Sequence, residues 1–97
     1  MKTRNYETMF ITRPDLEEEE REKAIERIKG IITDNGGEIK EVDEWGSRKL
    51  AYELNDYTSG YYTLINFEAD SSVLDEMNRV FKIMGEVLRH LIVRKDN

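Results

Sequence analysis

Apolar and polar residues alternate with a period of two in four stretches of the chain, which is the pattern of β-strands. These stretches cover residues 4–12, 38–54, 61–68 and 87–95. In the first stretch, Tyr6 and Phe10 fall on one face, whereas Met9 and Ile11 fall on the other. Apolar residues on both faces are expected of a strand that helices cover on one side and a partner covers on the other.

Two stretches between these strands repeat their apolar residues at the spacing of an α-helix. Asp15 and Glu18 predict a capping box at the start of the first helix, and the Asn-Gly-Gly at residues 35–37 predicts its end. The Asp-Ser-Ser at residues 70–72 is expected to cap the second helix, and Gly85 to end it. The two apolar stripes consist of Ala24, Ile25, Ile28, Ile31 and Ile32, and of Val73, Leu74, Met77, Val80, Phe81 and Met84.

The second predicted strand is long and irregular. Ile39 and Val42 lie three residues apart, which breaks the alternation and predicts a bulge between them. Gly46 predicts a second kink. Residues 55–60 are rich in turn-forming types, so this strand is expected to form a hairpin with the strand that follows.

The predicted order of elements is β-α-β-β-α-β in one domain that spans residues 1–97. With right-handed crossovers this order closes as an α+β, ferredoxin-like fold, a four-stranded antiparallel sheet with both helices on one face. The other face of the sheet is left open, and a contiguous apolar patch on such a face marks a partner surface. The residues expected on it are Met9, Ile11, Tyr62, Leu64, Leu88 and Ile92.

The composition narrows the function classes. The chain has 97 residues and a net charge of −6, which argues against a nucleic-acid binder that works alone. It has no cysteine, so disulfides and thiolate metal sites are excluded. No apolar run approaches the roughly 18 residues of a membrane span, and no signal peptide is evident at the start, so a cytoplasmic protein is expected.

The sequence contains few candidate catalytic residues or motifs. The acidic residues in the range 15–20 suit the solvated start of a helix, where negative side chains interact favourably with the positive end of the helix dipole. His90 has no evident orienting partner, so we interpret it as a surface residue of a strand and not as a general base. Neither a phosphate-binding glycine loop nor a dinucleotide fingerprint occurs. We therefore expect no enzyme activity, no cofactor and no metal site.

A basic and aromatic segment stands out in this acidic chain. Arg48 and Lys49 lie between Trp45 and Tyr52, a combination that suits RNA phosphates and bases. The same cations could instead guard the edge of a sheet against aggregation. On a strand the two side chains point to opposite faces. Arg94-Lys95 would support RNA binding only if the fold brings it to the same rim.

Two other proteins of this shape deserve comparison. Residues 60–67 invite comparison with the aromatic strand of an RNA-recognition motif, which would make the chain a solitary binder of single-stranded RNA. That motif places aromatics two apart on one face, but here Tyr61 is followed by Thr63. An acylphosphatase or a ligand-sensing module would carry a phosphate-cradling or glycine-rich loop after the first strand, and the Arg-Pro-Asp at residues 13–15 is neither.

Several segments, in order along the chain, resemble the family of bacterial ribosomal small-subunit protein six. They are residues 4–7 (Arg-Asn-Tyr-Glu), 13–15 (Arg-Pro-Asp), 35–37 (Asn-Gly-Gly), 45–52 (Trp-Gly-Ser-Arg-Lys-Leu-Ala-Tyr), 60–62 (Gly-Tyr-Tyr) and 88–94 (Leu-Arg-His-Leu-Ile-Val-Arg). The chain departs from the family at Glu53, where many members have proline, so no proline kink is expected there.

The resemblance implies a ferredoxin-like fold and a structural role in the small ribosomal subunit. It also implies a heterodimer with small-subunit protein eighteen, the pair binding the central domain of the ribosomal RNA. The expected RNA contacts are Arg48 and Lys49, with Lys2, Arg4, Arg94 and Lys95 at nearby rims. The expected contacts to the partner protein are Met9, Ile11, Trp45, Tyr62, Leu64, Leu88 and Ile92.

Overall fold

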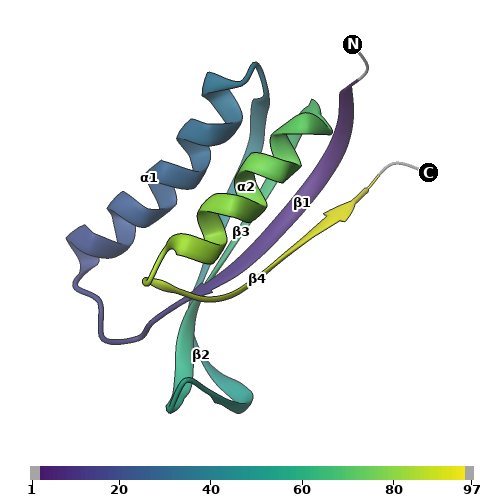
Figure 1. The fold of residues 1–97 in the computed structure, drawn as a ribbon. Helices are drawn as coiled ribbons and strands as arrows, with labels where there is room; N and C mark the ends of the chain where they lie inside the picture. The colour runs from purple at the N-terminus through teal and green to yellow at the C-terminus, as the bar shows by residue number, and fades with distance from the viewer. Residues whose placement is uncertain (1–2, 96–97) are drawn as a thin grey trace.

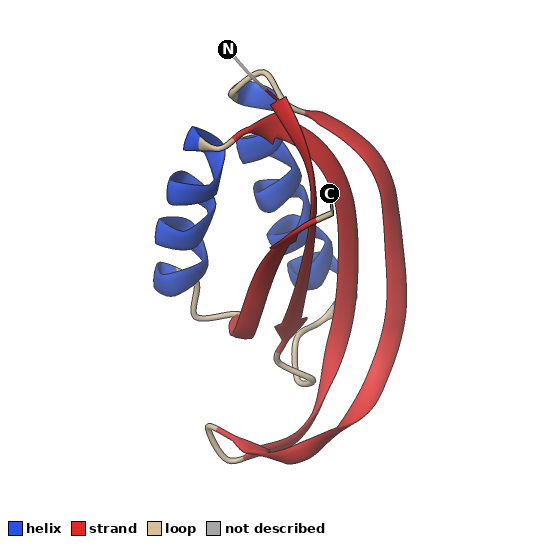
Figure 2. Cartoon of the chain, turned by 90° about the vertical axis from the view of Figure 1, so that its right-hand side faces the viewer, coloured by secondary structure: helices blue, strands red, loops and turns tan. Residues whose placement is uncertain are grey.

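A computed structural model describes residues 3–95 and contains the six elements in the predicted order. They are β1 (Thr3–Thr12), α1 (Glu18–Asp34), β2 (Glu38–Leu54), β3 (Tyr57–Asp70), α2 (Ser72–Ile83) and β4 (Val87–Arg94). The strands pair antiparallel in the order β2-β3-β1-β4. Both helices lie on one face of the sheet, and the other face is open (Figures 1 and 2). The predicted fold class is confirmed.

The core lies between the helices and the sheet, where the two predicted apolar stripes meet the inner residues of the strands. Phe10 on β1 is fully buried, and its ring lies 5.2 Å from that of Phe81 on α2. Burying an aromatic or branched side chain of this kind stabilises the fold by roughly 1.5–3 kcal/mol. Thr8 is also buried on this face, and its hydroxyl donates a hydrogen bond of 2.9 Å to the carbonyl of Leu91, so its polar group is satisfied.

The start of α1 differs from the prediction. Glu17 is the N-cap and Glu20 completes the capping box, its carboxylate accepting from the backbone N–H of Glu17 at 3.1 Å. Asp15 instead accepts from the hydroxyl of Tyr57 at 3.3 Å. The predicted cap was wrong because Leu16 is buried ahead of the helix, and burying it in the connecting loop delays the first turn.

The ends of α2 differ in smaller ways. The carboxylate of Asp70 accepts from the backbone N–H of Ser72 at 2.9 Å, so Asp70 supplies the cap. The hydrogen bonds from Ser72 hold the pKa of Asp70 below its ordinary value. The helix ends at Ile83 and the buried Met84 is already extended, so the helix stops before Gly85.

The hairpin of β2 and β3 extends past the helical layer (Figures 1 and 2). β2 has the predicted bounds, and both predicted irregularities are present as shifts in its pairing, at Ile39/Glu41 and at Glu44/Gly46. The turn is shorter than predicted. Asn55 and Asp56 alone close it, with φ of 48° and 70°, because these residue types tolerate the left-handed conformation that a two-residue hairpin turn requires. β3 therefore begins at Tyr57.

Candidate interface on the open face of the sheet

The open face of the sheet carries a band of apolar side chains that runs from strand to strand. Met9 on β1 lies opposite Leu64 on β3 and Leu91 on β4. Ile11 lies opposite Tyr62. Leu91 and Val93 are 39% and 42% exposed, which leaves the β4 side of the band accessible to a partner. We call this set the open-face band: Met9, Ile11, Trp45, Tyr62, Leu64, Leu91 and Val93.

The predicted place of Ile92 on this face was wrong. Ile92 pairs with the buried Thr8 and packs against the core under the helices. Leu91 and Val93 take the open face instead. Residues 91–93 are all apolar, so their alternation could not fix which face each one takes. Leu88 is half-buried and lies at the shift in pairing between the pairs Ile11–Arg89 and Thr12–Val87, so it is not one of the band residues.

Trp45 reaches the open face because β2 bulges. Glu44 pairs with Thr63 and Gly46 pairs with Tyr62, so Trp45 is the extra residue between them. Gly46 has a φ of +88°, which glycine adopts without a steric cost. The indole stacks on Tyr62, and its Nε1 donates to the carboxylate of Asp43 at 3.0 Å.

Arg48 and Lys49 lie on the hairpin beyond this band. Arg48 pairs with Gly60, and a Cβ on Gly60 would point at Ile11, so Arg48 shares the open face. Lys49 pairs with Ser59 and points to the opposite side, the side of the helices. Both side chains are exposed, and the predicted division of the two cations between faces agrees with this pairing.

The remaining predicted cations lie at the other end of the sheet. Arg4 is the second residue of β1 and Arg94 ends β4, and Arg94 pairs with Tyr6. Because β1 and β4 are antiparallel, these residues lie near the chain termini, away from the β2–β3 turn (Figure 1). Lys95 lies there too and forms an ion pair of 3.8 Å with Glu7. The prediction that they share a nearby rim with the hairpin was wrong, and Lys2 lies outside the described residues.

Charge is unevenly distributed along the open face. Toward the start of β2, Glu41 lies opposite Asn66 and Asp43 lies opposite Leu64. Neither carboxylate has a cation within 4 Å among residues 3–95. Toward the hairpin, Arg48 and Arg89 supply positive charge. The end near the start of β2 also carries Lys40 and Lys95, which line a depression there with Glu7, so charges of both signs are mixed at that end. At the hairpin end, Arg48 and Arg89 form no ion pair within residues 3–95.

Arg89 is a basic residue that the sequence analysis missed. Arg89 lies near the start of β4, opposite Ile11, on the open face of the sheet. Its Nη1 donates a 2.6 Å hydrogen bond to the hydroxyl of Tyr52 on the hairpin. The signal that could have found it is the alternation of Arg89 with Leu91 and Val93, once the face of Leu91 is known.

The hairpin is also held from the side of the helices. The guanidinium of Arg21 on α1 lies 4.0 Å from the centre of the Tyr61 ring, a cation–π contact. The Tyr61 hydroxyl donates to Glu44 at 2.8 Å, and burial, followed by Glu44, raises the pKa of Tyr61. Tyr57 adds its bond to Asp15. These contacts fix the direction in which the base of the hairpin leaves the sheet.

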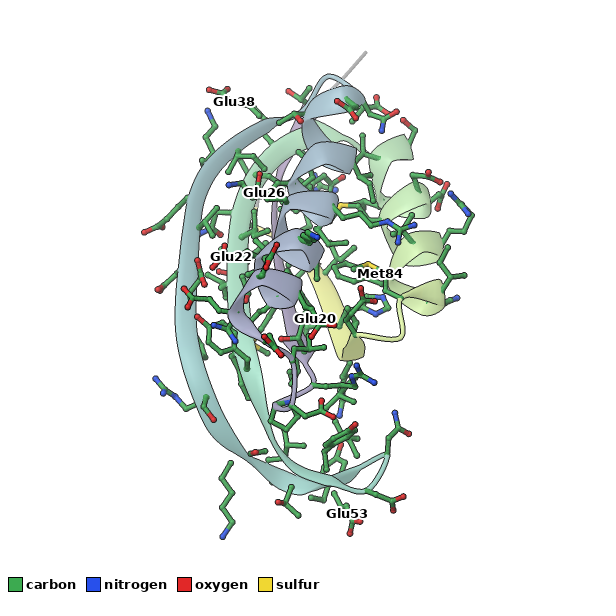
Figure 3. The ribbon with its side chains drawn as sticks, turned by 90° about the vertical axis from the view of Figure 1, so that its left-hand side faces the viewer. Glu20, Glu22, Glu26, Glu38, Glu53 and Met84 are labelled. Carbon is green, nitrogen blue, oxygen red and sulfur yellow. The ribbon has the colours of Figure 1, made fainter. Side chains whose placement is uncertain are left out.

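The acidic residues of α1 are separate from this surface. Glu22 and Glu26 lie on the outer side of α1, and Glu53 lies at the tip of the hairpin (Figure 3).

β2 continues through Glu53 to Leu54, as expected for a residue that, unlike proline, can remain in the strand.

His90 is not the surface residue that we predicted. It pairs with Phe10 on the face that the helices cover, and its ring lies 4.4 Å from that of Phe81. Its Nε2 is 2.9 Å from the side-chain oxygen of Asn78.

No group of three or more His, Asp or Glu side chains placed to hold a metal ion occurs among residues 3–95, and no helix in that range is long and apolar enough to span a membrane.

Comparison with known proteins finds similarity to one family, ribosomal protein S6. A family model described as ribosomal protein S6 matches residues 5–94. The small ribosomal subunit protein bS6 of Thermoanaerobacter pseudethanolicus is 57% identical over 93 residues, which are 96% of this chain and 98% of that protein. The bS6 protein of Caldanaerobacter subterraneus is 51% identical, covering 97% of this chain and 99% of that protein.

A solved structure is also similar. It is the crystal structure of 30S ribosomal protein S6 from Thermotoga maritima, which superimposes with a TM-score of 0.92 at 40% sequence identity. The match covers 97% of this chain and 89% of the other.

Proposed function

Because this chain belongs to the ribosomal protein S6 family, we propose that it binds the RNA of the small ribosomal subunit as one half of a heterodimer with small-subunit protein eighteen. Membership of the family establishes the general role of the chain. The chain is a structural protein of the small ribosomal subunit and not an enzyme, and its location is that of ribosomes in the cytoplasm.

The observation that carries the proposal is the open-face band with Arg48 and Arg89 beside it. The band exposes apolar surface that a protein partner would remove from water. The carboxylates of Glu41 and Asp43, which have no cation within 4 Å in residues 3–95, suit a basic protein, whereas Arg48 and Arg89 suit RNA. With a net charge of −6, the chain needs a basic partner to approach RNA closely.

The positions of the aromatic residues disfavour a solitary binder. Tyr61 faces the helices beneath Arg21, and the Tyr62 ring is covered on one side by Trp45. Neither ring is free to stack a base in the way that the open sheet of an RNA-recognition motif does.

Titration of a central-domain fragment of the ribosomal RNA tests the proposal. We expect little binding by the chain alone and strong binding by the chain with protein eighteen. Equal affinity of the chain alone and of the pair would support the solitary binder and refute the heterodimer.

Neutralising the hairpin cations tests their role. The double variant Arg48→Ala/Lys49→Ala, paired with protein eighteen, should bind the fragment more weakly and with a reduced dependence on salt. Each lost phosphate contact lowers the salt slope by about one. The variant Lys23→Ala/Arg27→Ala removes the same charges from the exposed side of α1 and should behave like the parent. An unchanged salt slope for the hairpin variant would contradict this role.

A further inference from the structure

We propose that Arg89, held by Tyr52, is the phosphate-binding centre of a groove between the open-face band and the hairpin, and that this groove receives an unpaired nucleotide of RNA. The inference rests on the proposed function, since it concerns the same RNA. It adds a binding site, a role in RNA binding for Arg89, and a contact between Arg89 and Tyr52 that the sequence pattern did not predict.

The groove adjoins a second shallow depression, and the two share three lining residues. The adjoining depression lies over the open-face band, on the surface proposed for protein eighteen, and is lined by Met9, Ile11, Tyr62, Arg89, His90 and Leu91. The groove itself lies between the band and the hairpin, and its lining includes Leu50, Tyr52 and Ile11. Ile11, Tyr62 and Arg89 line both depressions, so the floor is apolar and the cation stands where they join.

The guanidinium of Arg89 is fixed in place but still has donors to offer. Its Nη1 donates to the Tyr52 hydroxyl at 2.6 Å, and no carboxylate lies within 4 Å of it in residues 3–95. Arginine has five N–H donors, so the others remain available. An exposed guanidinium held by a neutral partner is suited to bind phosphate with two parallel hydrogen bonds.

The neighbours of Arg89 favour RNA over a protein carboxylate as the occupant. The Tyr52 ring is 62% exposed and lies next to the cation, and an exposed aromatic ring can stack on an unpaired base. Arg48 lies on the same face of β2, four residues before Tyr52, which is roughly 13 Å along a strand. One sugar-phosphate backbone running along the hairpin would therefore pass both cations.

Charge replacement at Arg89 is the decisive experiment. Arg89→Gln removes the charge and keeps N–H donors for Tyr52. The probe is the heterodimer with protein eighteen, titrated with the central-domain RNA fragment over a series of KCl concentrations. We expect about tenfold weaker binding and a salt slope lower by about one, whereas Arg89→Lys should recover the slope. Arg27→Gln, the same charge change on the exposed side of α1, should leave both quantities unchanged.

The ring of Tyr52 is tested separately. Tyr52→Leu removes the stacking surface without removing charge, so binding to the fragment should weaken several-fold while the slope stays near that of the parent. Formation of the heterodimer without RNA should be the same for the parent, Arg89→Gln and Tyr52→Leu.

Three results would overturn the inference. One is an Arg89→Gln variant that keeps the affinity or the slope of the parent. Another is a loss that appears in formation of the heterodimer and not in RNA binding, which would assign the groove to the protein partner. The third is failure of the unaltered pair to bind the RNA at all, which would refute the proposed function as well.

Discussion

The indole of Trp45 lies nearly parallel to the ring of Tyr62, with ring centres 6.2 Å apart and planes 9° apart. The two residues come from neighbouring strands, and the bulge in β2 is what brings the indole onto the open face. Trp45 is still 42% exposed, so the stack forms an accessible part of the open-face band.

Trp45 should report binding of the partner protein. The chain has one tryptophan, so its emission comes from this site. Because the proposed partner covers the open-face band, we expect a blue shift and less quenching by acrylamide when protein eighteen is added. The partner's own emission is subtracted. The RNA fragment added alone is the control and should leave the spectrum as it was. An unchanged spectrum at saturating partner would place the interface elsewhere.

Arg48 and Lys49 should contribute unequally to RNA binding. They lie on opposite sides of β2, and only Arg48 shares the face of Arg89. Arg48→Gln is therefore expected to reduce the salt slope of the heterodimer by about one, and Lys49→Gln to reduce it by much less. Equal effects of the two single substitutions, measured over the same salt series, would show that RNA wraps around the hairpin and does not follow one face.

The sequence was sufficient for the fold because the pattern of each long element is unambiguous. The irregularity after Ile39 followed from broken alternation, the one at Gly46 from the glycine itself, and the end of β2 from the turn-forming residues after it. The helical stripes were equally clear, and both of them line the core. Each of these signals is local, and the order of elements then leaves few ways to close the sheet.

The candidate site was predicted less well, because its errors depend on tertiary context. In β4, residues 91–93 are all apolar, and only pairing with β1 decides that Ile92 faces the core. Arg94 and Arg4 lie far from Arg48 because of the direction of the strands, which no local signal reveals. Arg89 was missed because its face, like that of Ile92, is decided only by the pairing of β4 with β1.

Acidification should destabilise the protein through His90. Burial, and then the charge of Lys82, lowers the pKa of His90 below its ordinary value of 6.5. The unfolded chain therefore takes up this proton at a higher pH than the folded chain does, so the free energy of unfolding falls as the pH falls through 6.5. Urea denaturation at pH 7.5 and pH 5.5 should show lower stability at pH 5.5.

The variant His90→Gln isolates this effect. The chain has one histidine, and Asp70 and Glu76 have pKa values lowered from 3.8 and 4.5, so they do not titrate in this range. The variant should lose most of the difference in unfolding free energy between the two pH values. A variant that retains the full difference would assign it to other groups.

Glycine substitutions should have opposite effects at two positions. A Cβ on Gly60 would overlap the Cγ2 of Ile11 and lie 3.3 Å from the carbonyl oxygen of Thr12. Gly60→Ala should therefore lower the free energy of unfolding by about 1–3 kcal/mol, because the hairpin must move away from β1. Gly30 lies inside α1 with nothing within 4 Å of a Cβ, so Gly30→Ala should raise it by about 0.5–1 kcal/mol. Urea denaturation of both variants measures the difference, and a Gly60→Ala variant as stable as the parent would show that the hairpin is not held against Ile11.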